Sequence, residues 1–343
     1  MTDRQAHLVG SLPGQDAEEA MRGALKRLSP WLTRLPDGET GDRRNWILHI
    51  IEGFRSHPDL ELVKAGDWSD YDRTPRFRIR KGHRLFGASL DLGYLTAVES
   101  SLPAFDRVRT EFGHADLSFQ VGIPGDFDMA MFTLGPAGAL RHRSPFTEAT
   151  VGQIRRIGSV LGERAVFQIE IPAELVLLAR VPARARPAAA RLIGGRVAAL
   201  AAGAQAGTRF GVHLCLGDMN HRALGRLADA RPLVALANAI AAAWPTDRPL
   251  EFIHAPLAAA DNPPSLNPSF YAPLAQLSIA RGVRFVAGFA HEDQSLEDQL
   301  QIRTMVDQEV GRPCDISTAC GLGRRDAAAG VAALDRIRAL TAA

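Results

Sequence analysis

Runs of apolar residues that end in polar residues or in Gly/Pro turns recur along the whole chain. Eight of these runs have the character of β-strands. They cover residues 7–11, 32–36, 117–124, 165–172, 211–218, 250–254, 283–291 and 314–321.

Stretches with helical character separate most of these runs, and they cover residues 16–28, 147–161, 188–206, 220–227, 235–243, 295–310 and 325–340. The sixth begins with a capping pattern at Ser295, and Gly311 and Pro313 predict its end. Eight strands that alternate with helices predict a parallel sheet, and their number indicates an α/β fold of the closed (β/α)8 TIM-barrel type. We therefore expect one catalytic barrel domain over residues 1–343.

Residues 55–110 interrupt this alternation after the second strand. They contain an alternating basic strand at 76–81, and we interpret the segment as an inserted hairpin followed by a helix over 94–105. Such a basic strand can be an ordinary solvated face, or it can form a lid or a docking face for an anionic ligand or partner.

Composition narrows the functional classes. The chain has 343 residues, of which 46% are hydrophobic and 23% charged, as in soluble globular proteins. A net charge of +2 favours no particular partner, and nothing in the sequence calls for nucleic acid. The longest apolar run, 233–244, is too short to span a bilayer, and no signal region follows Met1. The three cysteines are sparse and odd in number, so we expect a cytoplasmic protein without a membrane partner.

The fifth run, 211–218, carries the strongest chemical signal. Side chains alternate along a strand, so His213 and Cys215 are expected on one face, where an imidazole and a thiolate form half of a zinc site. Glu251 and Cys320 lie in other strand runs and can complete a tetrahedral shell at the carboxyl-terminal mouth of the barrel. Thiolates select zinc over magnesium or calcium. A zinc-bound thiolate is a nucleophile, which indicates alkyl transfer to sulfur.

Other polar residues are expected at the same mouth, where a ligand could satisfy them. They are Gly10, Ser11, Asp37, Glu39, Gln168, Glu170, Asp218, His254 and His291. Cys314 lies six residues before Cys320, so it is expected at the bottom of its strand and not at the metal.

Taken together, these pieces resemble the catalytic C-terminal barrel of cobalamin-independent methionine synthase, in the superfamily that also contains uroporphyrinogen decarboxylase. The resemblance covers nearly the whole chain and is carried by Gly10-Ser11-Leu12-Pro13, Asp37-Gly38-Glu39, His213-x-Cys215, Glu251 and Cys320-Gly321-Leu322.

The resemblance implies a zinc-dependent methyltransferase that acts on a small thiol, with homocysteine giving methionine. It implies four zinc ligands, which are His213, Cys215, Glu251 and Cys320. It also implies that Gly10 and Ser11 hold the amino-acid carboxylate, that Glu39 helps to hold the amino group, and that His291 assists proton transfer.

The chain also departs from the family pattern. The motif Asp-Glu-Pro-Ala becomes Glu170-Ile171-Pro172-Ala173, so one acid remains, and we expect Glu170 to act with Glu39 on an ammonium group. The tryptophan segment that packs the folate is not recognisable at 126–134, and the additional N-terminal barrel of the long enzymes is lacking. The methyl donor can therefore be a folate or a corrinoid protein.

Two other functions are compatible with the same barrel. A zinc-free decarboxylase or lyase would bind substrate carboxylates through arginines such as Arg43, Arg44 and Arg78, but it leaves the histidine and cysteines unexplained. A non-catalytic protein could hold structural zinc or deliver methyl groups with a partner, although structural sites are usually closed.

Overall fold

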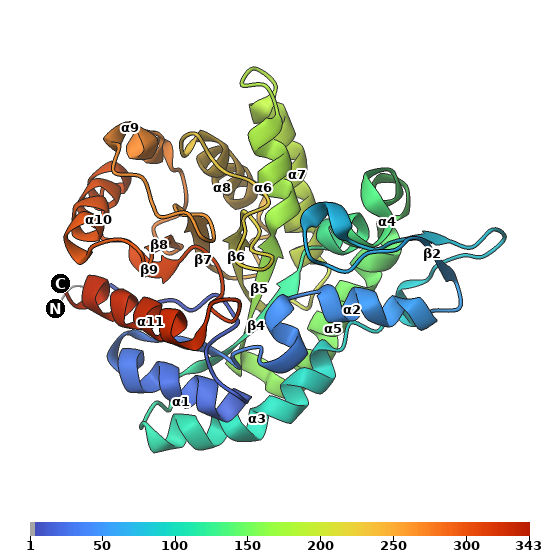
Figure 1. The fold of residues 1–343 in the computed structure, drawn as a ribbon, viewed down its shortest axis with the longest axis horizontal. Coiled ribbons are helices and arrows are strands. Elements are labelled where there is room, and N and C mark those ends of the chain that lie inside the picture. Colours follow the sequence, from blue (N-terminus) through green and yellow to red (C-terminus); the bar gives the residue numbers. More distant parts are fainter. Residues whose placement is uncertain (1–3) are drawn as a thin grey trace.

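The centre of the computed structural model, which describes residues 4–343, is a curled sheet of seven parallel strands (Figure 1). In spatial order the strands are β1 (Arg34–Pro36), β4 (Ser118–Pro124), β5 (Ala165–Ile171), β6 (Arg209–Leu214), β7 (Leu250–Pro256), β8 (Arg284–Ala290) and β9 (Asp315–Thr318). All six pairings between neighbours are parallel. Seven of the eight predicted runs therefore form strands of one barrel-like sheet.

The first predicted run, residues 7–11, does not form a regular strand. Ala6, the residue before this run, forms a single parallel bridge with Ile316 of β9, and the His7 amide donates to the Ile316 carbonyl at 2.9 Å. On the other side of the run, the carbonyls of Leu8 and Val9 accept hydrogen bonds from the side chains of Gln120 and Gln168, at 2.7 and 2.6 Å. Side-chain amides thus occupy backbone acceptors that a neighbouring strand would otherwise use, and the first predicted strand does not form.

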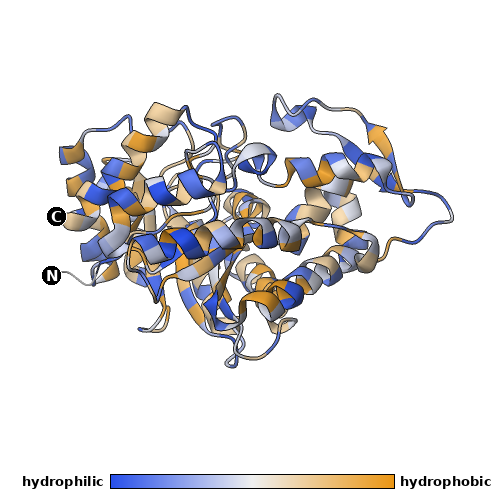
Figure 2. Cartoon of the chain, turned by 90° about the horizontal axis from the view of Figure 1, so that it is seen from below, coloured by the Kyte–Doolittle hydropathy of each residue, from blue (hydrophilic) through white to orange (hydrophobic). Residues whose placement is uncertain are grey.

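Eleven helices accompany the sheet in the described part of the chain. They are α1 (Ala17–Leu28), α2 (Leu48–Gly53), α3 (Tyr94–Glu111), α4 (Asp126–His142), α5 (Ser144–Leu161), α6 (Pro172–Arg180), α7 (Arg186–Ala202), α8 (Arg231–Ala243), α9 (Pro268–Tyr271), α10 (Leu296–Val310) and α11 (Ala327–Ala342). Hydrophilic and hydrophobic residues alternate along the helices around the sheet (Figure 2). Within the range 4–343, no helix combines the length and apolarity needed to cross a membrane.

Local signals explain which helix predictions succeed. The Ser295 side chain accepts a hydrogen bond from the Asp298 amide and caps α10, which ends at Gly311 with φ 75°. The predicted helix at 220–227 is wrong, because Asn220 and His221 have positive φ angles of 53° and 58°. Helices α2, α4, α6 and α9 were not predicted.

Strands β2 (Leu60–Lys64) and β3 (Arg76–Ile79) form a separate antiparallel hairpin, which projects from the body of the molecule (Figures 1 and 2). Phe77 is buried, whereas Arg78 is exposed and pairs with Glu61. The loop between the two strands returns to the main body. There the Tyr71 hydroxyl donates to the carbonyl of Arg222 and accepts from the amide of Met219, at 3.1 and 2.9 Å.

Candidate metal centre

His213, Cys215 and Cys320 converge at the carboxyl-terminal end of the sheet. Their ligand atoms all lie within 4.8 Å of one another. His213 is the fifth of the six residues of β6, Cys215 follows that strand directly, and Cys320 follows β9. The parallel register of the strands therefore brings together three residues that are up to 107 positions apart in the sequence.

The spacing of these three atoms suits a tetrahedral zinc ion. The two sulfurs are 3.6 Å apart, and Cys320 Sγ is 4.0 Å from His213 Nε2. Bond lengths of about 2.3 Å for Zn–S and 2.0 Å for Zn–N give tetrahedral edges of about 3.5–3.8 Å. Two soft thiolates and one imidazole also match the ligand preference of zinc, so the donor set fits this metal.

Each sulfur accepts an N–H group from the protein. The Gly217 amide donates to Cys215 Sγ at 3.3 Å, and Arg324 Nη2 donates to Cys320 Sγ at 3.1 Å. The hydrogen bond from Cys215, together with the Arg324 guanidinium, lowers the pKa of Cys320. The same sulfur–sulfur hydrogen bond and burial raise the pKa of Cys215. Cys320 is therefore the first of the two to become a thiolate.

Glu251 is not part of this group, which corrects the predicted four-ligand set. It is the second residue of β7, at the amino-terminal end of the sheet, and its carboxylate pairs with Arg209 at 2.5 Å and Arg34 at 3.5 Å. The position of Glu251 near the start of its predicted strand already indicated this, because the start of a parallel strand lies at the opposite end of the sheet from the carboxyl-terminal mouth.

His254 lies beside His213 instead. The two residues are in register across β6 and β7, and their Nδ1 atoms are 2.7 Å apart. The second ring nitrogen of His254, Nε2, is 2.9 Å from the carbonyl oxygen of Thr318. Burial lowers the pKa of His254 to about 4, so its ring is neutral near pH 7.

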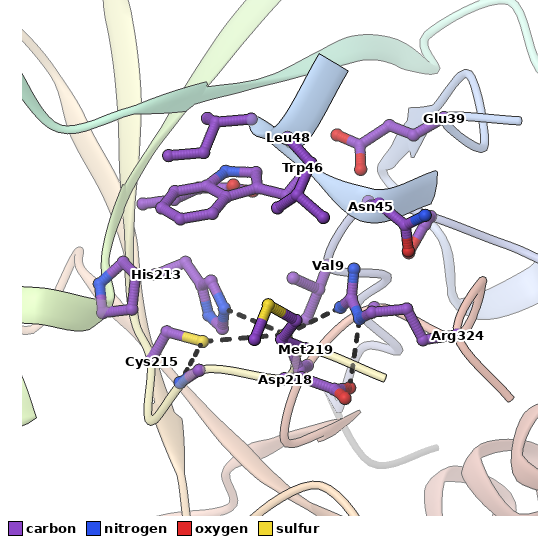
Figure 3. Close-up of a pocket in the computed structure, with 18 of the residues that line it drawn as sticks. Val9, Glu39, Asn45, Trp46, Leu48, His213, Cys215, Asp218, Met219 and Arg324 are labelled. Atoms are coloured by element: carbon purple, nitrogen blue, oxygen red, sulfur yellow. Dashed lines mark hydrogen bonds and ion pairs between the residues drawn. The ribbon is translucent and has the colours of Figure 1, made fainter. Parts of the chain in front are cut away.

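A pocket opens directly above the three donors. Figure 3 shows Trp46 and Leu48 on one wall, His213 and Cys215 on a second, and Arg324 with Asp218 on a third. All four predicted substrate-binding residues also line the pocket; these are Gly10, Ser11, Glu39 and Glu170. Most of the other lining residues are apolar, and they include Ile47, Trp68, Tyr71, Phe132, Pro172 and Met219.

Glu39 and Glu170 face each other across Gly122. A Cβ atom on that glycine would lie 2.8 Å from Glu170 Oε1 and 2.9 Å from Glu39 Oε1. Burial, and then the charge of Glu170, raise the pKa of Glu39 to about 8, and burial raises that of Glu170 to about 7. Two carboxylates held this close repel each other, so without a cation the protonated forms are favoured. A bound cation would favour the ionised forms.

Gly10 and Ser11 shape the same pocket by close approach. A Cβ at Gly10 would lie 2.8 Å from Glu39 Oε2, so a larger residue would displace that carboxyl. Ser11 Oγ accepts a hydrogen bond from the Gly323 amide at 3.1 Å, which ties the first segment to the loop after Cys320. Gly10 therefore shapes the pocket because it lacks a side chain, and Ser11 does so through the hydrogen bond of its hydroxyl.

Backbone strain concentrates around the pocket. Three of the residues that line it, Glu39, Trp46 and Trp68, have positive φ angles of 43°, 58° and 58°. Non-glycine residues adopt this conformation only when their surroundings enforce it, and they cluster at functional sites. Asp37 does not face the pocket, because it accepts from the Glu39 amide at 3.0 Å and pairs with Arg43 at 2.6 Å.

His291 is not oriented as predicted. It is buried, it is not among the pocket-lining residues, and its Nε2 lies 2.9 Å from the carbonyl of Ala260. Its Nδ1 accepts from the Asp293 amide at 3.2 Å. Burial lowers the pKa of His291, which weakens the case for a proton donor at neutral pH.

The arginines of the decarboxylase hypothesis do not line this pocket. Arg43 pairs with Asp37, Arg78 pairs with Glu61, and the Arg44 Nε donates to the carbonyl of Gly41. Cys314 is buried, and its thiol donates to the carbonyl of Arg312 at 3.5 Å, away from the other two cysteines.

Several pocket residues escaped the sequence analysis. Arg324 lines the pocket and lies four residues after Cys320, so a basic residue close to a candidate ligand was an available signal. Trp46, Trp68 and Tyr71 come from loops whose path depends on distant contacts, so no local pattern identified them.

No family model matches the chain, and no curated protein matches it in sequence. Solved structures do match it along nearly its whole length. A B12-independent methionine synthase from Shewanella sp. W3-18-1, in complex with selenomethionine, is 13% identical with a TM-score of 0.56, covering 99% of this chain and 96% of that one. A methyltransferase from Methanosarcina mazei is 14% identical with a TM-score of 0.55, covering 99% and 91%. The chain thus shares the fold of the proteins that its sequence resembles.

Proposed function

We propose that this chain is an enzyme, a zinc-dependent methyltransferase that transfers a methyl group to homocysteine and forms methionine. One observation carries the proposal: a single pocket combines three donors with zinc-type spacing and two facing carboxyls. The likeness in fold to a methionine synthase and to a methyltransferase supports the same reading.

His213, Cys215 and Cys320 would hold the metal. Bound there, zinc would supply the Lewis acidity that keeps a nearby thiol ionised at neutral pH. Two thiolates balance a dication, since +2 and −2 sum to zero, so the centre would not repel an anionic sulfur. Three protein ligands leave a fourth position open, which is the usual arrangement of catalytic rather than structural zinc sites.

Glu39 and Glu170 would bind the ammonium group of the amino acid by charge-assisted hydrogen bonds. An ammonium group between them replaces the mutual repulsion of two carboxylates with attraction, which suits an amino-acid thiol better than a simple thiol. Gly10 and Ser11, on the same side of the pocket, would approach the substrate carboxylate through their backbone.

The apolar lining residues Trp46, Trp68 and Phe132 would exclude water from the reacting sulfur. The methionine synthase neighbour is described as B12-independent, which favours a folate as methyl donor. A corrinoid protein is the alternative donor.

The test is to measure bound zinc and methionine formation from homocysteine, with methyltetrahydrofolate and with methylcobalamin in separate reactions. Wild-type protein should hold about one zinc ion per chain, and Cys320→Ser should lose both the metal and the product. Cys314→Ser removes a buried thiol away from the pocket and should keep both. Folded wild-type protein without zinc would contradict the metal assignment, and zinc without turnover with either donor would contradict methyl transfer.

A further inference from the structure

The most informative feature that the proposed function leaves unused is His254. Its side chain is fully buried, and it occupies the position on β7 that is in register with His213 on β6. Of the three candidate ligands, His213 is the only one that would bind metal as a neutral group. A neutral imidazole has a proton on one ring nitrogen and a lone pair on the other, and only the nitrogen with the lone pair can bind metal. Whatever sets that choice decides whether His213 can bind metal through Nε2.

The contacts of His254 determine the choice. Its Nε2 lies 2.9 Å from the carbonyl oxygen of Thr318, which can only accept, so Nε2 carries the proton. In a neutral ring the other nitrogen, Nδ1, is then a bare acceptor. That atom lies 2.7 Å from His213 Nδ1, which must therefore be the donor. His213 Nε2 is left with a free lone pair, 4.0 Å from Cys320 Sγ.

The fold makes room for this arrangement at one position on the neighbouring strand. A Cβ atom at Gly288 on β8 would lie 2.7 Å from His254 Nε2 and 2.9 Å from the Thr318 carbonyl oxygen. Any larger residue there would push the ring away from its acceptor. The His7 ring, with its centroid 5.6 Å from that of His254, also restricts movement of the ring.

We propose that His254 is a positioning residue of the metal centre, which accepts a hydrogen bond from His213 and thereby directs His213 Nε2 at the two cysteine sulfurs. This inference rests on the proposed zinc site, and it assigns His254 an orienting role in place of a fourth ligand. Groups that orient metal-binding histidines in this way typically change metal affinity by about 10- to 100-fold when they are removed.

Zinc affinity, measured by competition with a chromophoric chelator, tests the proposal. His254→Leu should weaken zinc binding by about 10- to 100-fold, whereas His254→Asn, whose Oδ1 can accept from His213, should retain most of the affinity. Cys314→Ser is the control, because it changes a buried side chain away from the three donors, and its zinc affinity should equal that of wild type. Equal affinities for His254→Leu and wild type would overturn the proposal.

Two spectroscopic measurements separate this inference from the proposed function. Nitrogen NMR of the metal-free wild-type protein should show the proton on Nδ1 of His213 and on Nε2 of His254, and the opposite tautomers would refute the inference even if zinc binds. X-ray absorption of the zinc-loaded protein should show one imidazole and two sulfurs. Two imidazoles would make His254 a ligand and overturn its positioning role. If the protein shows the expected tautomers but binds no zinc, the hydrogen bonds of His254 are supported and the proposed metal site is rejected.

Discussion

Under the proposed function, the two facing carboxyls should make the binding of an amino-acid ligand strongly dependent on pH. Glu39 has a pKa of about 8 and Glu170 a pKa of about 7, so both are largely protonated at pH 6. An ammonium group binds the ionised forms. Affinity should therefore rise with pH until the ligand amine itself begins to lose its proton.

The size of the rise reveals how many carboxylates bind the ligand. Between pH 6 and pH 8, the ionised fraction of a group with pKa 7 rises from about 9% to about 91%, a factor of about ten. For a group with pKa 8 it rises from about 1% to about 50%. If both carboxylates must be ionised, affinity should increase by about 500-fold over this range, against about tenfold if Glu170 alone is needed.

Calorimetric titration with methionine provides the assay, because the thioether sulfur does not titrate and cannot add its own pH dependence. The deaminated analogue 4-(methylsulfanyl)butanoate is the matched control and should show no such increase. In Glu170→Gln only Glu39 remains, so the increase should fall below about 50-fold. Equal pH profiles for methionine and the analogue would refute the role of the carboxyl pair.

The free energy of unfolding of the ligand-free protein should fall as pH rises, whereas ligand affinity should increase. Both groups have pKa values above those of an unfolded chain, so their contribution to stability is complete at low pH and is lost as pH rises through about 7 to 8. Ligand-free protein should therefore become easier to unfold between pH 5 and pH 8. Methionine should restore part of the loss.

Three further predictions concern neighbouring groups. Arg324→Met removes the N–H donor to Cys320 Sγ, so alkylation of Cys320 by iodoacetamide in the zinc-loaded protein should accelerate, as measured by mass spectrometry; an unchanged rate would contradict this. Tyr71→Phe removes both hydrogen bonds of the hydroxyl, so hydrogen exchange at the Met219 amide should quicken, and unaltered exchange would show that other contacts hold the loop. Burial, and then the charge of Glu174, raise the pKa of Asp128, so its contribution to stability is lost as pH rises. In urea denaturation, Asp128→Asn should therefore be more stable than wild type at pH 8, with a smaller gain in stability at pH 5. A larger gain at pH 5 than at pH 8 would contradict the raised pKa of Asp128.

The sheet was largely predictable from the sequence because its strands are rich in apolar residues and are buried on both faces. For β5, every residue is buried, and the predicted and observed bounds differ by one position. The failures come from contacts between distant segments. The loop at Asn220 turns where its side-chain amide donates to the carbonyl of Trp68, 152 positions away, and no local pattern encodes that contact.

The candidate metal centre also contains both a predicted part and a part that the sequence did not reveal. His213 and Cys320 were predictable because residues near the ends of parallel strands meet at one edge of the sheet. Glu251 failed although its side chain has the right chemistry, because it stands three residues before His254, at the start of β7, where Arg209 at the start of β6 neutralises it. Strand register therefore decides between the two: His254 is in register with His213, and Glu251 is not. With a neutral histidine beside His213, the proposed zinc centre would contain only two anionic ligands, the thiolates of Cys215 and Cys320, and would keep a coordination position for the sulfur of a substrate.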